Sequence, residues 1–164
     1  MSALWQFPHP VNEVSARLVA AGVALLCSAT LVLDEPLLLV PLAYGFVARV
    51  LTGPTLSPLG LVVTRAVIPR LPVAPKPVPG PPKRFAQGIG AVLSTGAVGL
   101  HFGLGAAGAA DVLVAMILLA ATLEAVFALC LGCRIFTLLM RAGVIPAEVC
   151  EACDDLGSRR PIAA

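Results

Sequence analysis

The stretch ARLVAAGVALLCSATLVL, residues 16–33, decides the fold class, and Arg17 is its only charged residue. A helix that crosses the hydrocarbon core of a membrane needs about 20 mostly apolar residues. The whole chain suits the same solvent, because 59% of its 164 residues are hydrophobic, 12% are charged and its mean hydropathy is +0.97. Soluble domains contain about 25% charged residues. We therefore predict an all-α, polytopic membrane protein.

Three further segments are long and apolar enough to be spans: residues 36–51, 85–108 and 111–133. Only Asp34 and Glu35 separate the first two spans, which predicts a tight helical hairpin. Asp111 is a suitable N-cap for the fourth span. We expect residues 1–164 to form a single domain, a bundle of four transmembrane helices with additional short interfacial and cytoplasmic helices.

The basic residues indicate the orientation of this bundle. Nine lie in the long second connection or after the fourth span, and Arg17 and Arg49 lie at the ends of the first and second spans on the same side. The other two connections contain only acidic charges, at Asp34, Glu35 and Asp111. Because Lys and Arg concentrate in cytoplasmic loops, both termini are predicted to be cytoplasmic in a bacterial cytoplasmic membrane. A net charge of +2 without a basic stripe argues against nucleic acid as a partner.

The cytoplasmic segments differ in composition. Ser57 and Pro58 begin an apolar stretch that is too short to span and is predicted to lie in the interface. Residues 69–84 are rich in proline and predict an extended linker of polyproline II type. Residues 134–164 form a tail that contains an amphipathic segment ending at Gly143.

Polar side chains inside the third span suggest a polar seam. Gln87, Ser94 and His101 recur every seventh residue and therefore share one helix face. Such groups are either interhelical hydrogen-bonding residues or part of a transport path. Small residues also recur at every fourth position of this span: Ala91, Thr95, Gly99 and Gly103. They predict that another helix packs closely against the third span.

Glu124 is the acidic residue in the fourth span. A carboxylate in hydrocarbon needs a charged partner, and we expect Arg17 or Arg49 to provide it, with a proton relay as the alternative role. On one continuous helix, Glu124 and Cys133 would lie on opposite faces. Glu124 is therefore not expected to activate that thiol.

Four cysteines form the pattern C-x2-C-x16-C-x2-C: Cys130, Cys133, Cys150 and Cys153. This spacing is typical of zinc sites. The remaining Cys27 is interpreted as a small hydrophobic residue of the first span. Reducing conditions in the cytoplasm argue against a structural disulfide, so metal binding and thiol redox chemistry remain open.

The expected electrostatics favour metal over redox chemistry. Cys130 and Cys133 are predicted at the C-terminal end of the fourth span, where the helix dipole disfavours a thiolate. Acidic residues flank the second pair and raise the pKa of its thiols. A bound divalent cation would deprotonate all four cysteines despite these effects.

Several motifs together identify a family resemblance: VNEVSARLVA, RVLTGPTLSPLG, PPKRFAQGIG, LEAVFALCLGCRIF and IPAEVCEAC. In this order they resemble the bacterial integral membrane family known as domain of unknown function 4395. The RFAQ and CLGC segments are the most specific. The resemblance implies a four-helix membrane protein and implies no particular activity.

Three functions remain open on the sequence. The first is a non-enzymatic membrane accessory protein whose Cys130, Cys133, Cys150 and Cys153 bind zinc on the cytoplasmic side. The second is a redox partner of a thiol oxidoreductase or sulfurtransferase, which cycles the two cysteine pairs through disulfides. The third is a small transporter that uses Gln87, Ser94 and His101.

Overall fold

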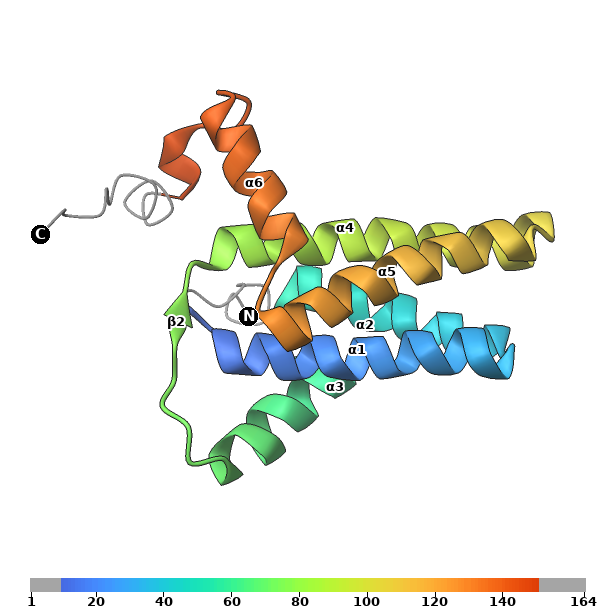
Figure 1. The fold of residues 1–164 in the computed structure, drawn as a ribbon, viewed down its shortest axis with the longest axis horizontal. Helices are drawn as coiled ribbons and strands as arrows, with labels where there is room; N and C mark the ends of the chain where they lie inside the picture. The colour runs from blue at the N-terminus through green and yellow to red at the C-terminus, as the bar shows by residue number, and fades with distance from the viewer. Residues whose placement is uncertain (1–9, 151–164) are drawn as a thin grey trace, which may run out of the picture.

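The computed structural model describes residues 10–150, and these residues are predominantly helical, as predicted. Long helices lie side by side along the molecule (Figure 1). They are α1 (Glu13–Leu33), α2 (Leu39–Thr52), α4 (Gly80–Val98) and α5 (Ala107–Phe127). The shorter helix α6 (Leu131–Arg141) leaves the end of this bundle at an angle.

Helices α1 and α2 form the predicted hairpin. Asn12 caps α1 by accepting a hydrogen bond from the Val14 N–H at 3.1 Å. The helix ends at Asp34, which has the left-handed φ of 51° that Asp tolerates better than most residues. A 3₁₀ turn (Pro36–Leu38) then leads directly into α2.

A long connection follows α2. Ser57 caps the short helix α3 (Pro58–Leu61) through the Gly60 N–H. The chain continues as a π-helical segment (Val62–Val67) and a 3₁₀ turn (Ile68–Arg70).

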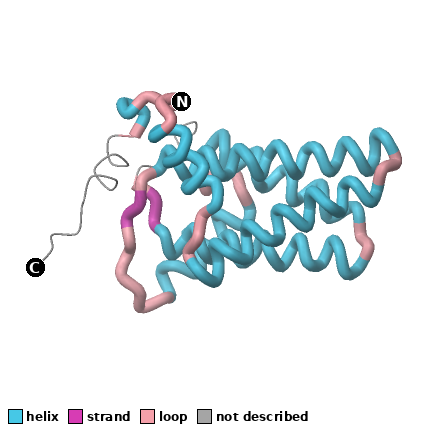
Figure 2. Tube along the Cα trace, turned by 45° about the horizontal axis from the view of Figure 1, so that its top comes forward, coloured by secondary structure: helices cyan, strands magenta, loops and turns pink. Residues whose placement is uncertain are grey.

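The predicted extended linker is shorter than residues 69–84. Strand β2 (Pro77–Val78) pairs antiparallel with β1 (Val11–Asn12), and Figure 2 shows this small pair at the end of the bundle. Helix α4 begins at Gly80, because proline in a first helical turn loses no backbone hydrogen bond. The linker is therefore tied to the start of α1 and is not free along its length.

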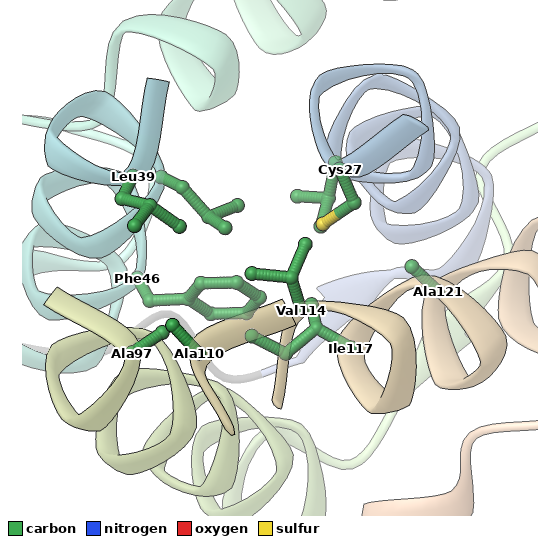
Figure 3. Packing of buried hydrophobic residues seen from close by; sticks show 10 residues of the cluster. Cys27, Leu39, Phe46, Ala97, Ala110, Val114, Ile117 and Ala121 are labelled. Carbon is green, nitrogen blue, oxygen red and sulfur yellow. The ribbon is translucent and has the colours of Figure 1, made fainter. Parts of the chain in front are cut away.

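The helices pack as two main pairs, α1 with α5 and α2 with α4, and α4 also contacts α5 and α6. The buried centre includes Cys27, Leu42, Phe46, Val114 and Ile117 (Figure 3). With lipid as solvent, such contacts stabilise the bundle mainly by close packing.

The closest helix approach on α4 is not at the predicted small residues. Nothing lies within 4 Å of a Cβ placed at Gly99 or Gly103, so the prediction is wrong for these two positions. Instead, the Phe46 ring of α2 lies directly over Gly90. Of the fourfold pattern, only Ala91 packs against the core, and Thr95, Gly99 and Gly103 are exposed.

Three helices of the described chain are long and apolar enough to cross a membrane: Glu13–Leu33, Gly80–Gly103 and Ala107–Phe127. Pro36–Thr52 is a shorter apolar helix. The lengths of the three candidate spans indicate a membrane protein.

The predicted limits of the last two spans are shifted. The third span covers residues 80–103 instead of 85–108, and its last turn is π-helical from Gly99 to Gly103. The helix predicted as the fourth span begins at Ala107 and ends at Phe127, so Asp111 is not its N-cap and it does not reach Cys133.

The early end of α5 has two structural causes. Ala128 has the left-handed φ of 56°, and the Ala128 and Leu129 N–H groups bond back to the Glu124 and Leu123 carbonyls. In addition, Arg17 of α1 donates to the carbonyl oxygens of Ala125 and Val126 at 2.9–3.2 Å. A tertiary contact thus satisfies carbonyls that the helix end leaves open.

Candidate functional site

Cys130 and Cys133 form the first turn of α6. Cys130 is the N-cap, and its Sγ accepts a hydrogen bond from the Cys133 N–H at 3.4 Å. The predicted position at the C-terminal end of a continuous span is therefore wrong. Since the positive end of the α6 dipole lies at Cys130, the helix favours a thiolate there instead of opposing it.

The two thiols differ in acidity. The hydrogen bond from the Cys133 side chain, helped by Lys83, lowers the pKa of Cys130 against the opposing effects of burial and Glu124. The same hydrogen bond and burial raise the pKa of Cys133. Cys130 is therefore the better nucleophile and leaving group, while Cys133 keeps its proton.

Helix α6 is held close to α4 at this point. The Cα of Gly132 lies so near α4 that an added Cβ would be 2.6 Å from the Ala86 Cα. Farther along α6, the buried Phe136 ring packs against Phe85 with centroids 5.6 Å apart. These contacts fix the first turn of α6, and with it the two cysteines, against the bundle.

Lys83 and Glu124 form an ion pair next to the cysteines. Their side chains are only 11% and 15% exposed, and Lys83 interacts electrostatically with both Cys130 and Cys133. The prediction that Glu124 pairs with Arg17 or Arg49 is wrong. Sequence analysis placed Lys83 in a cytoplasmic linker, and only the early start of α4 brings it to Glu124.

The expectation that Glu124 and Cys133 lie on opposite faces of one continuous helix is also wrong, because α5 ends at Phe127. The Glu124 carboxylate disfavours the thiolate of both Cys130 and Cys133, so it lies within electrostatic range of each. The break at Ala128 explains this proximity, because α5 ends there and the cysteines belong to α6, which runs in a different direction. Glu124 therefore belongs to the site.

Arg49 is a second buried cation at the same end of the bundle. It is 6% exposed, and it donates to Gln87 Oε1 at 2.8 Å and to Ser57 Oγ at 3.2 Å. Its guanidinium lies 4.5 Å from the centre of the Phe46 ring. Within residues 10–150, the ion pairs are Lys76–Glu13 and Lys83–Glu124, and neither includes Arg49.

A cavity of about 220 Å³ lies between the helices and extends to Cys130. Its wall is mostly apolar, with side chains from α1, α2, α4, α5 and α6. The polar residues that line it are Gln87, Glu124 and Cys130. Cys130 is 8% exposed, whereas Cys133 is partly exposed outside this cavity lining.

The second cysteine pair does not join the first in the described residues. Cys130 and Cys133 are free, Cys150 is buried and disulfide-bonded, and Cys153 lies outside the described residues. Among residues 10–150, no group of three or more His, Cys, Asp or Glu side chains is arranged to hold a metal ion.

The predicted polar seam is divided along α4. Gln87 bonds to Arg49 at the cysteine end, and Ser94 is fully buried and donates to the Ala91 carbonyl within its own helix. His101 is in the π-helical turn at the opposite end, where it contacts Phe102. Each of the three residues therefore has different surroundings.

Comparisons with known proteins give one match. A family model described as a domain of unknown function (DUF4395) matches residues 11–141. No curated protein and no solved structure matches the chain. Because the match covers most of the chain, the chain belongs to the DUF4395 family. The matched region includes the candidate spans, the Lys83–Glu124 pair and the first cysteine pair.

Proposed function

We propose that the protein is a membrane thiol–disulfide redox partner that uses Cys130 and Cys133. The position of Cys130 as the N-cap of α6, with its Sγ bonded to the Cys133 N–H, carries the proposal. This geometry gives a Cys-x-x-Cys pair one stabilised thiolate and one protonated thiol. It favours the redox alternative over the metal–thiolate alternative.

The unequal exposure of the two cysteines supports an order of events. In the oxidised protein, a thiolate of a partner protein attacks the more accessible Cys133 sulfur. The Cys130–Cys133 bond breaks, and Cys130 leaves as the stabilised thiolate. The second thiolate of the partner then attacks the partner's first sulfur, which is bonded to Cys133 in the mixed disulfide. Cys133 departs as a thiolate and takes up a proton. The partner dithiol has lost two electrons, and Cys130 and Cys133 have gained them.

We also propose four spans with both termini in the bacterial cytoplasm. The segment Pro36–Thr52 would cross as the second span, at roughly 25 Å of helix length. The start of α1 and α4 and the end of α2 and α5 lie at the same end of the bundle as α6 (Figure 1). Arg17, Arg49 and Lys83 are at this end, in agreement with the excess of Lys and Arg on cytoplasmic surfaces.

The topology is tested with single cysteines in intact cells. An impermeant maleimide should label Glu35→Cys, in the turn between α1 and α2, in intact cells. It should label Lys76→Cys only after the cells are opened. The reverse pattern would overturn the proposed orientation.

The redox function is tested on the full-length chain in detergent, with Cys27, Cys150 and Cys153 replaced by Ala. The protein is equilibrated in glutathione buffers of graded potential, its free thiols are trapped with maleimide, and the products are weighed by mass spectrometry. We expect one cooperative two-electron transition of Cys130 and Cys133. Two thiols that remain reduced in every buffer would exclude the proposal.

The metal prediction for Cys130, Cys133, Cys150 and Cys153 requires a separate measurement. Zinc content is determined on the unmodified chain purified without chelator. One zinc per chain, lost in both Cys130→Ala and Cys150→Ala, would support the zinc site instead of the dithiol.

A further inference from the structure

We propose that the cavity beside Cys130 binds the ring of a lipid-soluble quinone, which accepts the two electrons of the Cys130–Cys133 dithiol. The proposal rests on the redox function proposed above and adds the electron acceptor. It would make the protein a thiol:quinone oxidoreductase.

The orientation of the two sulfurs is the first argument. The more nucleophilic Cys130 lines an apolar cavity and is nearly inaccessible to solvent, while Cys133 is the one that is partly exposed outside it. A second protein can approach Cys133 from outside the bundle. The reaction partner of Cys130 must instead be small enough to enter the cavity.

The wall of the cavity limits the chemistry of this partner. Apolar side chains such as Val23, Leu93, Met116 and Ile117 provide most of the lining. These residues belong to candidate membrane-spanning helices, so the cavity lies within reach of lipid-dissolved molecules. A dithiol releases two electrons when it forms a disulfide. An apolar two-electron acceptor that dissolves in lipid and takes up protons is a quinone.

The size of the cavity suits one ring. An apolar protein cavity of about 150 Å³ binds benzene. The cavity here is about 220 Å³, which accommodates a six-membered ring with small substituents, and it is not fully enclosed, so an isoprenoid tail need not fit inside it.

Gln87 supplies a hydrogen-bond donor for the ring. Arg49 can only donate, and its Nε bonds to Gln87 Oε1, so the Gln87 amide nitrogen is directed away from Arg49. Because Gln87 lines the cavity, this N–H₂ group can donate to a quinone carbonyl oxygen. The bond would strengthen as negative charge develops on that oxygen during reduction.

The transfer is balanced in two steps. First, the Cys130 thiolate adds to a ring carbon. Its electron pair forms the new S–C bond, and a π electron pair of the ring moves onto the carbonyl oxygen to give the enolate. Second, the Cys133 sulfur attacks Cys130, the S–C bond breaks, and its electrons remain on the ring. The quinol takes one proton from the Cys133 thiol and one from water. One thiolate, one thiol, one quinone and one proton thus give one disulfide and one quinol.

The test uses the reduced full-length protein in detergent with decylubiquinone as the probe. Quinone loss is followed by ultraviolet absorbance, and the disulfide is counted by thiol trapping. We expect one quinone reduced per dithiol, and a Cys133→Ala variant that accumulates a coloured thiolate–quinone complex. The colour should be absent in Cys130→Ala.

Two matched variants of α5 test the cavity. Ala120 lines the cavity, and Ala115 is exposed on the outer face of the same helix. Ala120→Phe should slow quinone reduction by about tenfold or more because its ring fills the binding space, whereas Ala115→Phe should react at the original rate. Equal rates in both variants would overturn the proposal.

Glutathione titration of the same variants separates the two proposals. A normal two-electron transition in Ala120→Phe shows that the variant is folded and that its slow step is the quinone reaction. If the unmodified protein cycles in glutathione but does not reduce decylubiquinone, the quinone proposal fails and the redox function stands. If it cycles in neither, both fail.

Discussion

Cys27 and Cys130 are both buried free thiols, but they lie in different regions of the molecule. Cys27 is in the middle of α1, fully buried among apolar side chains such as Leu42 and Val114 (Figure 3). Cys130 is at a helix start, next to the Cys133 N–H and the Lys83–Glu124 pair. The difference shows that burial alone does not decide the reactivity of a thiol. The groups that can stabilise its thiolate decide it.

The largest effect is expected from removing Cys130 or Cys133. In the protein whose Cys150 and Cys153 are already Ala, Cys130→Ala should abolish two-electron cycling, because Cys133 alone cannot form the intramolecular disulfide. Cys27→Ala should leave the cycle unchanged, since Cys27 has no second thiol beside it among the described residues. Mass spectrometry after thiol trapping measures both. Loss of cycling in Cys27→Ala would remove the distinction between the two regions.

The Lys83–Glu124 pair should contribute several kcal/mol to stability. Removing one partner of a buried pair costs about 3–5 kcal/mol, because the other charge is left uncompensated. Lys83→Met should therefore lower the thermal midpoint strongly, and the double variant Lys83→Met/Glu124→Leu should recover most of it.

Lys76 provides the control for this prediction. It pairs with Glu13 at 2.8 Å but is 72% exposed, so Lys76→Met should change stability by no more than about 1 kcal/mol. Similar losses in Lys83→Met and Lys76→Met would show that the burial of the pair near Cys130 has no energetic consequence.

A smaller effect is expected at the junction of α5 and α6. Ala128 has a φ of 56°, which glycine adopts without steric cost. Ala128→Gly should raise the free energy of unfolding by about 1 kcal/mol. Ala125→Gly, inside α5, should lower it by about the same amount. Chemical unfolding in mixed micelles measures both, and stabilisation by Ala125→Gly would contradict the helix end described here.

The smallest effect is expected on the pKa of Cys130 from the Glu124 carboxylate, which influences it less than the Cys133 hydrogen bond and burial do. This carboxylate raises the pKa of Cys130, so Glu124→Gln should lower it, and the thiolate should then persist to lower pH. The pH profile of Cys130 alkylation by iodoacetamide should shift toward lower pH. Glu35→Gln, at the opposite end of the bundle, should leave the profile in place. A shift to higher pH in Glu124→Gln would contradict the assignment.

The fold was largely predictable from the sequence. For the candidate site, the sequence predicted the two cysteines but not their surroundings. Apolar segments and the Asp34–Glu35 turn predicted the helices and the first hairpin. The Cys-x-x-Cys motif identified Cys130 and Cys133 as candidates. The effect of the helix dipole on their thiolates was predicted with the wrong sign, because no glycine or proline marks the end of α5 and the apolar pattern continues through Cys133. Nothing in the sequence indicated that Lys83 belongs to the site, since it lies within a proline-rich stretch that predicts a linker.

The sequence by itself determined that this chain forms apolar helices of membrane-spanning length, because hydropathy and segment length depend only on the order of residues. It also determined that four cysteines lie in two Cys-x-x-Cys pairs, one at the end of the last apolar segment and one after it. Only the tertiary structure decided where α5 ends, because Arg17 on a distant helix binds the carbonyls that are left open. That break makes Cys130 the N-cap of a new helix and reverses the sign of the helix-dipole effect at its sulfur.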